Sequence, residues 1–458
     1  MKVFGSSGTR GVANEELTPS FVLRVAQAAG TVWDADRAAV ARDTRTTGRM
    51  LANAATSGLQ SVGSDVDRLG VVPTPGLQSY CEAEGVPGVM ITASHNPPEY
   101  NGVKLIGADG VELSVEDIER VEETFLPESA DPVSWAATGR DVTIDGARRR
   151  YITELLESVD RGRIADADLT VALDPGHGAG ALTSPEFFRR LGCDVVTVNA
   201  QADGHFPGRN PEPVAENLVD LGRLVRAADA DVGIAHDGDA DRAIFFDETG
   251  SYIEGDATLA ALAEAGLGAG DTTVSAVNVS QRLVDVVDRV GADLELTPIG
   301  STRIMTRIRE LREAGATVPV AGEGNGGVIF PPFRVNRDGA YTAAKFLELL
   351  ADAPASEVVA PYDGYENVRV NVEYDTSRER DRLVAAAGDY AESVTDAEVT
   401  TIDGYRLDYG DAWVLARPSG TEPVVRVYAE ATDRARAEAL VAAFEDRLQE
   451  ALASAREQ

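Results

Sequence analysis

Apolar runs alternate with amphipathic segments along most of the chain, in the order typical of β-α-β units. Thr18 and Pro19 form an N-cap and first-turn pair, and apolar residues then recur at helical spacing. The pattern next predicts a buried strand over 38–43, a helix over 50–62 and a strand over 88–92. The N-terminal part is therefore expected to form an α/β unit.

The same rhythm returns twice. A strand entering a glycine-rich turn is predicted over 169–180, and another entering an acidic loop over 231–242. A third round begins with a strand over 272–277 and ends in a strand and glycine-rich loop over 318–327. Each round is roughly 100 residues, the size of a small domain, so the rhythm predicts three related α/β units. Loops that follow their strands would lie along one edge of each sheet, where such sheets bind ligands.

The last part of the chain has a different pattern, with antiparallel strand pairs and two long helices. The segment 352–361 is predicted to be a linker into this part. The predicted fold class is therefore α/β, with three related mixed α/β domains and a smaller α+β C-terminal domain. The predicted domains are a serine-loop domain over 1–150, an acidic-loop domain over 151–252, a glycine-loop domain over 253–356 and an arginine-loop domain over 357–458.

Charge narrows the classes of partner. The 458 residues include 42 Lys and Arg against 76 Asp and Glu, a formal net charge of −34, which would repel nucleic acid and anionic membranes. Lysine occurs only at positions 2, 104 and 345, and this acidic, lysine-poor composition fits concentrated salt, where charge repulsion is screened. Two cysteines exclude a disulfide framework, and no long apolar segment is present. We expect a soluble, cytoplasmic protein with neither nucleic acid nor membrane as partner.

The segment TASHNPPEYNGVK, residues 92–104, places a serine on a stiff loop after a predicted strand. Asn96 and the two following prolines restrict the backbone, so the hydroxyl of Ser94 would be presented rigidly. A serine in a turn more often serves local hydrogen bonding, and that interpretation stays open. Lys104 is a candidate for proton exchange, because this chain otherwise uses arginine, whose guanidinium stays protonated.

The segment HDGDADR carries Asp237, Asp239 and Asp241 at alternate positions. Carboxylates that converge repel one another unless a cation lies between them, and such hard oxygen ligands select Mg²⁺ or Ca²⁺. A helix-loop-helix calcium site is disfavoured, because Arg242 stands at the sixth position instead of glycine and the flanking segments are predicted strands. A solvated acidic turn is the remaining alternative.

Two further loops carry polar chemistry. GEGNGG, residues 322–327, places Glu323 and Asn325 among glycines, where they could bind sugar hydroxyls, although a plain glycine-rich turn would look the same. In RPSGTEP, residues 417–423, Arg417 and the nearby Arg426 flank a Ser-Gly-Thr turn, which indicates an anion cradle or a structural salt bridge.

Together FGSSGTRG, TASHNP, DGDADR, GEGNGG and RPSGTEP, in this order, resemble the α-D-phosphohexomutase family. The resemblance spans Phe4 to Arg426 and implies four domains around a central cleft, each giving one loop to the active site. It implies a mutase that interconverts hexose 1-phosphate and hexose 6-phosphate through a phosphoserine and a 1,6-bisphosphate of glucose or a hexosamine. It also implies an enzyme of the isomerase class that acts as a monomer or homodimer. A Mg²⁺-dependent sugar-phosphate phosphatase and a non-catalytic sugar-phosphate-binding protein are the alternatives.

The resemblance also implies a role for each loop. Ser94 would carry the phosphoryl group and, with the three aspartates, hold Mg²⁺, while Arg10 and Arg242 neutralise charge and Lys104 and His95 assist proton transfer. Glu323 and Asn325 would bind the sugar, and the non-reacting phosphate would be held by Arg417, Ser419, Gly420, Thr421 and Arg426. Many bacterial members have Ser-Gly-His where this chain has Asn325, Gly326 and Gly327, so the preferred sugar, whether glucosamine, glucose or mannose, stays open.

Overall fold

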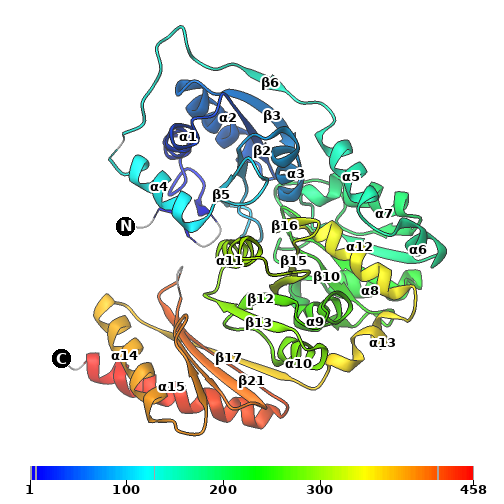
Figure 1. The fold of residues 1–458 in the computed structure, drawn as a ribbon, viewed down its shortest axis with the longest axis vertical. Helices are drawn as coiled ribbons and strands as arrows, with labels where there is room; N and C mark the ends of the chain where they lie inside the picture. The colour runs from blue at the N-terminus through cyan, green and yellow to red at the C-terminus, as the bar shows by residue number, and fades with distance from the viewer. Residues whose placement is uncertain (1–2, 6–7, 128, 420–421, 457–458) are drawn as a thin grey trace.

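The computed structural model describes residues 3–5, 8–127, 129–419 and 422–456. Figure 1 shows the N-terminal unit at one end of the molecule, two central units, and a C-terminal unit whose sheet is backed by two long helices. No described helix is long and apolar enough to cross a membrane.

The first unit is a six-stranded sheet in the order β1-β5-β4-β2-β3-β6. Alternate residues of its central strand β2 face opposite sides: Ala38 and Val40 pack toward α1 and α2, whereas Ala39 and Ala41 pack toward α3. The sheet is therefore covered on both faces. The elements are β1 (Thr9–Val12), α1 (Pro19–Trp33), β2 (Arg37–Arg42), α2 (Gly48–Ser61), β3 (Asp65–Val71), α3 (Thr74–Glu84), β4 (Gly88–Ile91), β5 (Tyr100–Ile106), α4 (Val115–Phe125) and β6 (Asp141–Thr143).

The second unit repeats this strand order. Its sheet is β11-β10-β9-β7-β8, so β10-β9-β7-β8 corresponds to β5-β4-β2-β3, with the same parallel and antiparallel pairings. The elements are α5 (Ala147–Glu157), α6 (Arg161–Asp166), β7 (Thr170–Asp174), η1 (Ala179–Leu182), α7 (Ser184–Leu191), β8 (Asp194–Thr197), η2 (Ala215–Asn217), α8 (Val219–Ala228), β9 (Val232–Ala235), β10 (Ile244–Phe246) and β11 (Tyr252–Ile253).

The third unit keeps the pattern but divides its sheet. β12 pairs in parallel with β13, while β14, β15 and β16 form a separate antiparallel sheet. Side chains on β12 bridge the division, since the hydroxyls of Thr273 and Ser275 donate to the carbonyls of Val320 and Gly322. The elements are α9 (Gly255–Gly266), β12 (Thr272–Ala276), α10 (Gln281–Val290), β13 (Asp293–Thr297), α11 (Ser301–Glu313), β14 (Ala321–Glu323), β15 (Gly327–Phe330), β16 (Arg334–Arg337) and α12 (Gly339–Leu350). The prediction of three related α/β units is confirmed.

The predicted linker is wrong in its central part. Residues 355–359 form the short helix α13 (Ala355–Val359), followed by η3 (Ala360–Tyr362), because Ala355 and Val359 are buried in the hydrophobic core shared by the second and third units. The proline and serine of this segment favour a linker, but its apolar residues also recur at helical spacing.

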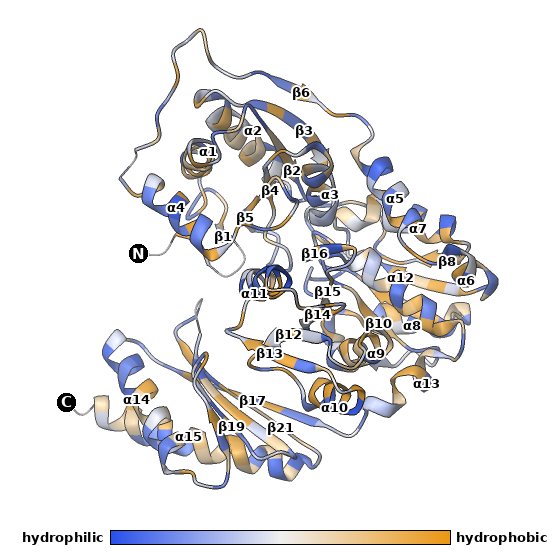
Figure 2. Cartoon of the chain, viewed as in Figure 1, coloured by the Kyte–Doolittle hydropathy of each residue, from blue (hydrophilic) through white to orange (hydrophobic). Residues whose placement is uncertain are grey.

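The C-terminal unit is α+β, as predicted. Its five strands form an antiparallel sheet in the order β17-β21-β20-β19-β18, and α14 and α15 bury their apolar residues against it. The strands are largely apolar in Figure 2, whereas both helices also carry many hydrophilic residues. The elements are β17 (Glu366–Glu373), α14 (Ser377–Ser393), β18 (Glu398–Thr400), β19 (Tyr405–Asp408), β20 (Ala412–Pro418), β21 (Val424–Ala431) and α15 (Arg434–Arg456).

Candidate active site

Three of the predicted loops leave equivalent strands of the three related units. The Ser94 loop follows β4, the aspartate loop follows β9, and the GEGNGG loop joins β14 to β15. Hydrogen bonds connect the loops: the Ser94 hydroxyl donates to Asp237 of the aspartate loop, and the amide of Ala243, directly after that loop, donates to the carbonyl of Gly326. The common topology thus explains why segments far apart in sequence meet.

Ser94 lies at the centre of this meeting point. It is fully buried, its φ is 52°, and its amide donates to the Thr92 hydroxyl at 2.9 Å. Its hydroxyl donates to Oδ2 of Asp237 at 2.6 Å, although the two residues are 143 positions apart. The approach needs a glycine at position 238, because a Cβ there would lie 2.5 Å from the Ser94 carbonyl oxygen.

The three aspartates form a buried cluster that suits a divalent cation. Each offers an oxygen within 4.8 Å of the others, and Oδ1 of Asp239 and Oδ1 of Asp241 are buried without a hydrogen-bond partner in the described structure. Burial, together with the charges of Asp241 and Asp239, raises the pKa of Asp237 above its ordinary value. Hard oxygen ligands, uncompensated negative charge and two unused oxygens fit Mg²⁺.

Lys104 partly balances this cluster. Its Nζ lies 2.8 Å from Oδ2 of Asp239 and 3.0 Å from Oδ2 of Asp241, and Glu112 is 4.0 Å away. Burial alone would lower the pKa of this amine, but the neighbouring carboxylates outweigh burial and raise it. Lys104 is therefore held as an ammonium ion, which can donate a proton or hydrogen bond but cannot accept one.

Three arginines, Arg10, Arg242 and Arg337, lie close to one another and to the aspartate cluster. Burial lowers the pKa of Arg10, and the nearby Arg242 and Arg337 lower it further against the pull of the aspartates. Arg10 donates from Nη1 to Oδ1 of Asn96 at 2.8 Å. Burial, and then the charges of Arg242 and Arg10, hold the pKa of His95 far below its usual range, so its imidazole is neutral. Mutual repulsion of these cations favours a bound anion such as a phosphoryl group.

The predicted sugar-binding side chains are more open. Glu323 is half-buried at the end of β14, and Asn325 is exposed at the tip of the turn, where its Oδ1 accepts from the Gly327 amide at 3.0 Å. Groups that bind sugar hydroxyls have to remain accessible, so this exposure agrees with the predicted use.

The residues predicted to form a phosphate cradle lie in the C-terminal unit. Arg417 and Arg426 are opposite one another in the β20–β21 ladder, which brings both side chains to one place. Nε of Arg417 lies 3.0 Å from Asp403, and Arg426 pairs with Glu422. The amide of Ser419 donates to the Val424 carbonyl at 2.8 Å. Gly420 and Thr421, also predicted for this cradle, lie outside the described residues.

The cradle is not joined directly to Ser94. Among the described residues, the ion pairs of Arg417 and Arg426 stay within their own unit, although Oδ2 of Asp403 also accepts from the Ile299 amide of the third unit at 3.1 Å. The structure therefore brings together the first three loops and leaves the fourth connected through Asp403.

Two buried arginines that the sequence analysis missed hold the loops in place. Arg45 pairs with Asp43 and donates to carbonyls of the Ser94 loop, while Arg209 pairs with Asp174 and donates to the His236 carbonyl before the aspartate loop. Asp43 follows β2 and Asp174 ends β7, so the two units repeat one arrangement at equivalent strands. An Asp directly after a buried strand was the available signal.

Thr74 and Arg337 were also missed. The Thr74 hydroxyl donates to Oδ2 of Asp239 at 2.6 Å, and Nη2 of Arg337 donates to Oδ2 of Asp241 at 2.6 Å. Neither lies in a motif that suggested chemistry, so only the folded chain reveals their proximity to the aspartates.

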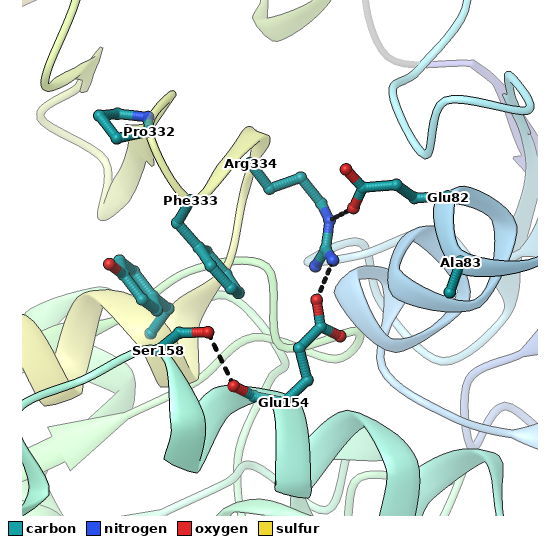
Figure 3. Close-up of a pocket in the computed structure, with 8 residues that line it drawn as sticks. Glu82, Ala83, Glu154, Ser158, Pro332, Phe333 and Arg334 are labelled. Carbon is teal, nitrogen blue, oxygen red and sulfur yellow. Dashed lines mark hydrogen bonds and ion pairs between the residues drawn. The ribbon is translucent and has the colours of Figure 1, made fainter.

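A separate hollow lies between α3, α5 and the start of β16. Figure 3 shows Arg334 between Glu82 and Glu154, and both glutamates accept hydrogen bonds from its guanidinium. Phe333 and Tyr341 stack nearby, with ring centroids 4.0 Å apart. Glu82 belongs to the first unit, Glu154 to the second and Arg334 to the third, so these contacts connect all three units.

Comparison with known protein families covers nearly the whole chain. The four domain descriptions of phosphoglucomutase/phosphomannomutase match it in order: alpha/beta/alpha domain I over residues 1–131, domain II over 149–250, domain III over 254–365, and the C-terminal domain over 367–447.

Individual relatives agree with this result. The chain is 41% identical to a phosphoglucomutase/phosphomannomutase of Thermococcus kodakarensis, covering 95% of this chain and 96% of the relative. It is 35% identical to a phosphoglucosamine/phosphogalactosamine mutase of Sulfurisphaera tokodaii, covering 94% and 96%. A crystal structure of a phosphoglucomutase/phosphomannomutase family protein from Burkholderia thailandensis superposes with a TM-score of 0.84 at 29% identity, covering 99% and 98%. The chain belongs to the phosphoglucomutase/phosphomannomutase family.

Proposed function

We propose that this chain is a phosphohexomutase that interconverts hexose 1-phosphates and hexose 6-phosphates, with Ser94 as its phosphoryl carrier. The observation that carries the proposal is the 2.6 Å contact between the Ser94 hydroxyl and Asp237 within the buried aspartate cluster. A serine that stores a phosphoryl group needs a cation site and further positive charge close by. Both lie near Ser94 here.

Asp237, Asp239 and Asp241, together with the phosphorylated Ser94, would hold Mg²⁺. When bound, the ion would neutralise charge on the transferring phosphoryl group. Arg10 and Arg242 would stabilise the same charge. Lys104 and His95 would assist proton transfer once substrate is bound. In the free protein the raised pKa makes Lys104 a weak acid and the lowered pKa makes His95 a weak base, and a bound phosphoryl anion would offset the Arg242 and Arg10 charges that lower the pKa of His95.

The overall reaction requires two phosphate positions. Ser94 gives its phosphoryl group to a free sugar hydroxyl, which forms a 1,6-bisphosphate, and regains a phosphoryl group from the other position after the bisphosphate turns over. During each transfer the non-reacting phosphate would be held by Arg417, Ser419, Gly420, Thr421 and Arg426, while Glu323 and Asn325 bind sugar hydroxyls. A mobile C-terminal unit would let the bisphosphate reorient without leaving.

Replacement of the carrier tests the proposal. The Ser94→Ala enzyme should lose nearly all turnover yet still bind hexose phosphate, because the phosphate cradle lies in another unit. Ser64→Ala is the matched control, since Ser64 is also buried in the first unit and its hydroxyl only donates to the Ala35 carbonyl. Unchanged turnover in Ser94→Ala would refute the proposal.

Two measurements separate the alternatives. Phosphorus NMR of a hexose 1-phosphate with enzyme, Mg²⁺ and a trace of bisphosphate should show the 6-phosphate, whereas inorganic phosphate alone would indicate a phosphatase. Intact mass should show one added phosphoryl group that is absent in Ser94→Ala; a protein that never gains it would be a binding protein.

Sugar preference is a separate part of the proposal. The relatives carry names that span glucose, mannose and hexosamine phosphates. Comparing kcat/KM for the 1-phosphates of glucosamine, glucose and mannose decides between them. The assay should be run in concentrated KCl, because a net charge of −34 predicts that the chain needs screening.

A further inference from the structure

In the β15–β16 hairpin, Gly327 of the GEGNGG loop lies beneath the side-chain stem of Arg337. Arg337 on β16 stands opposite Ile329 on β15, so Gly327, two residues before Ile329, lies diagonally across on the same face. A Cβ at position 327 would lie 2.7 Å from Cδ of Arg337. The Arg337 stem can therefore cross this point only because residue 327 has no side chain.

The far end of Arg337 reaches the aspartate loop. Its side chain is 4% exposed, and Nη2 donates to Oδ2 of Asp241 at 2.6 Å. Lys104 donates to the same oxygen at 3.0 Å, so both cations engage one oxygen of the carboxylate. The other oxygen, Oδ1, accepts no hydrogen bond in the described structure and lies 3.9 Å from Nε of Arg242, and Asp241 is one of the three residues suited to hold a cation.

We infer that Arg337 is a positioning residue. Its stem occupies the space that a side chain at position 327 would need, and its guanidinium holds Asp241, so that Arg337 joins the GEGNGG loop to the aspartate loop. It fixes Asp241 so that Oδ1 is available for Mg²⁺, and its stem packs over the turn that carries Glu323 and Asn325. This inference rests on the proposed function.

Charge alone does not account for this arrangement. Lys104 already supplies a positive charge to the same oxygen of Asp241. Arg337 adds a planar guanidinium on a side chain that is fixed at both ends: β16 holds its backbone, and the Asp241 carboxylate binds its guanidinium. Supporting contacts to metal-binding side chains commonly set their orientation, and their loss reduces activity without direct contact with the substrate.

A double-mutant cycle tests the pairing of Gly327 with Arg337. Gly327→Ala in the otherwise unchanged enzyme should lower kcat about tenfold, because the new Cβ displaces the Arg337 stem. In an Arg337→Ala background the closest contact, with the Arg337 stem, is gone and only Oδ1 of Asn325, 2.9 Å from the new Cβ, still has to shift, so the same change should cost no more than about threefold. In an Arg337→Lys background, which keeps the stem, it should again cost about tenfold. The thermal midpoint of each variant, measured with Mg²⁺ and without substrate, should show the same non-additivity.

Several results would overturn the inference. Wild-type kcat in Gly327→Ala would do so by itself, even if Arg337→Ala failed to fold. Equal losses in all three backgrounds would mean that the two residues act independently. The KM for hexose 1-phosphate should stay within about twofold, since the phosphate cradle is elsewhere, and a change confined to KM would place Arg337 in substrate binding instead.

The outcomes are separable from failure of the proposed function. If Ser94→Ala retains full turnover, the carrier assignment fails whatever the cycle shows. If Ser94→Ala is inactive and Gly327→Ala and Arg337→Ala combine additively, only the role of Arg337 fails.

Discussion

Arg45 should decide whether the Ser94 loop keeps its shape. This side chain is fully buried, pairs with Asp43 at 3.1 Å, and donates to four carbonyl oxygens of the loop. The carbonyls belong to Ser94, Asn96, Pro97 and Tyr100, at 2.9, 2.6, 2.5 and 3.0 Å. No other single side chain makes as many described contacts to this loop.

The cost of losing Arg45 follows from these contacts. Arg45→Met would leave Asp43 as a buried carboxylate without its ion pair, which costs about 3 to 5 kcal/mol. The carbonyls that lose a charged donor add about 1 kcal/mol each where water cannot replace it. With only one carbonyl left unsatisfied the total is already about 5 kcal/mol, and with all four it reaches about 9 kcal/mol, a large part of the ~5 to 15 kcal/mol that stabilises a typical domain. Because the contacts are local, we expect the loop to open well before the unit unfolds.

Hydrogen exchange measures this opening. At about 1.4 kcal/mol per factor of ten, backbone exchange over residues 92–104 should accelerate about a thousandfold or more in Arg45→Met, and phosphorylation of Ser94 by bisphosphate should fall in parallel. Arg42→Met is the matched control, since Arg42 is half-buried nearby and donates once, to the Asp43 carbonyl. Protection of the loop equal to that of the unmodified enzyme would refute the reasoning.

Three further predictions concern charge. Burial raises the pKa of Asp338 to about 6, so the folded chain binds a proton that the unfolded chain releases, and the free energy of unfolding falls as pH rises from about 4 to about 6. Asp338→Asn should remove this pH dependence and, at pH 7, gain at most about 3 kcal/mol in the free energy of unfolding relative to wild type. Urea unfolding at pH 4 and pH 7 measures both effects. Chelation of Mg²⁺ should stop turnover but lower the thermal midpoint by only a few degrees, whereas Lys104→Met, without its internal counterion, should show a larger Mg²⁺-dependent shift. Arg417→Ala should weaken substrate binding by about 1.5 to 3 kcal/mol, seen as a higher KM with little change in kcat. Asp408→Ala is the control: it removes another Asp–Arg pair of the same sheet and should leave KM unchanged. The first prediction is contradicted if Asp338→Asn keeps the pH dependence of wild type, and the second if chelation lowers the thermal midpoint of the wild-type enzyme by much more than a few degrees. The third is contradicted if Arg417→Ala has the KM of wild type.

Much of the site could be predicted from sequence because its chemistry is local. The spacing of Asp237, Asp239 and Asp241 in one loop, and the turn residues around Ser94, are readable without coordinates. The three related units could be predicted for the same reason, since strand and helix periodicity depend on neighbours in the chain. The helix over 355–359 was missed because its burial depends on a core built by distant elements.

The residue types of each loop can be read from the sequence, because turn geometry and side-chain chemistry depend on only a few neighbouring positions. Which side chains contact the same carboxylate oxygen follows only from the folded chain. Lys104 and Arg337 meet on Asp241 although they are far from it in sequence, and Gly327 is informative only once the hairpin sets it beneath Arg337. Such pairings arise from sheet register and domain packing, whose energies are summed over many distant contacts and leave no mark on any short stretch of chain.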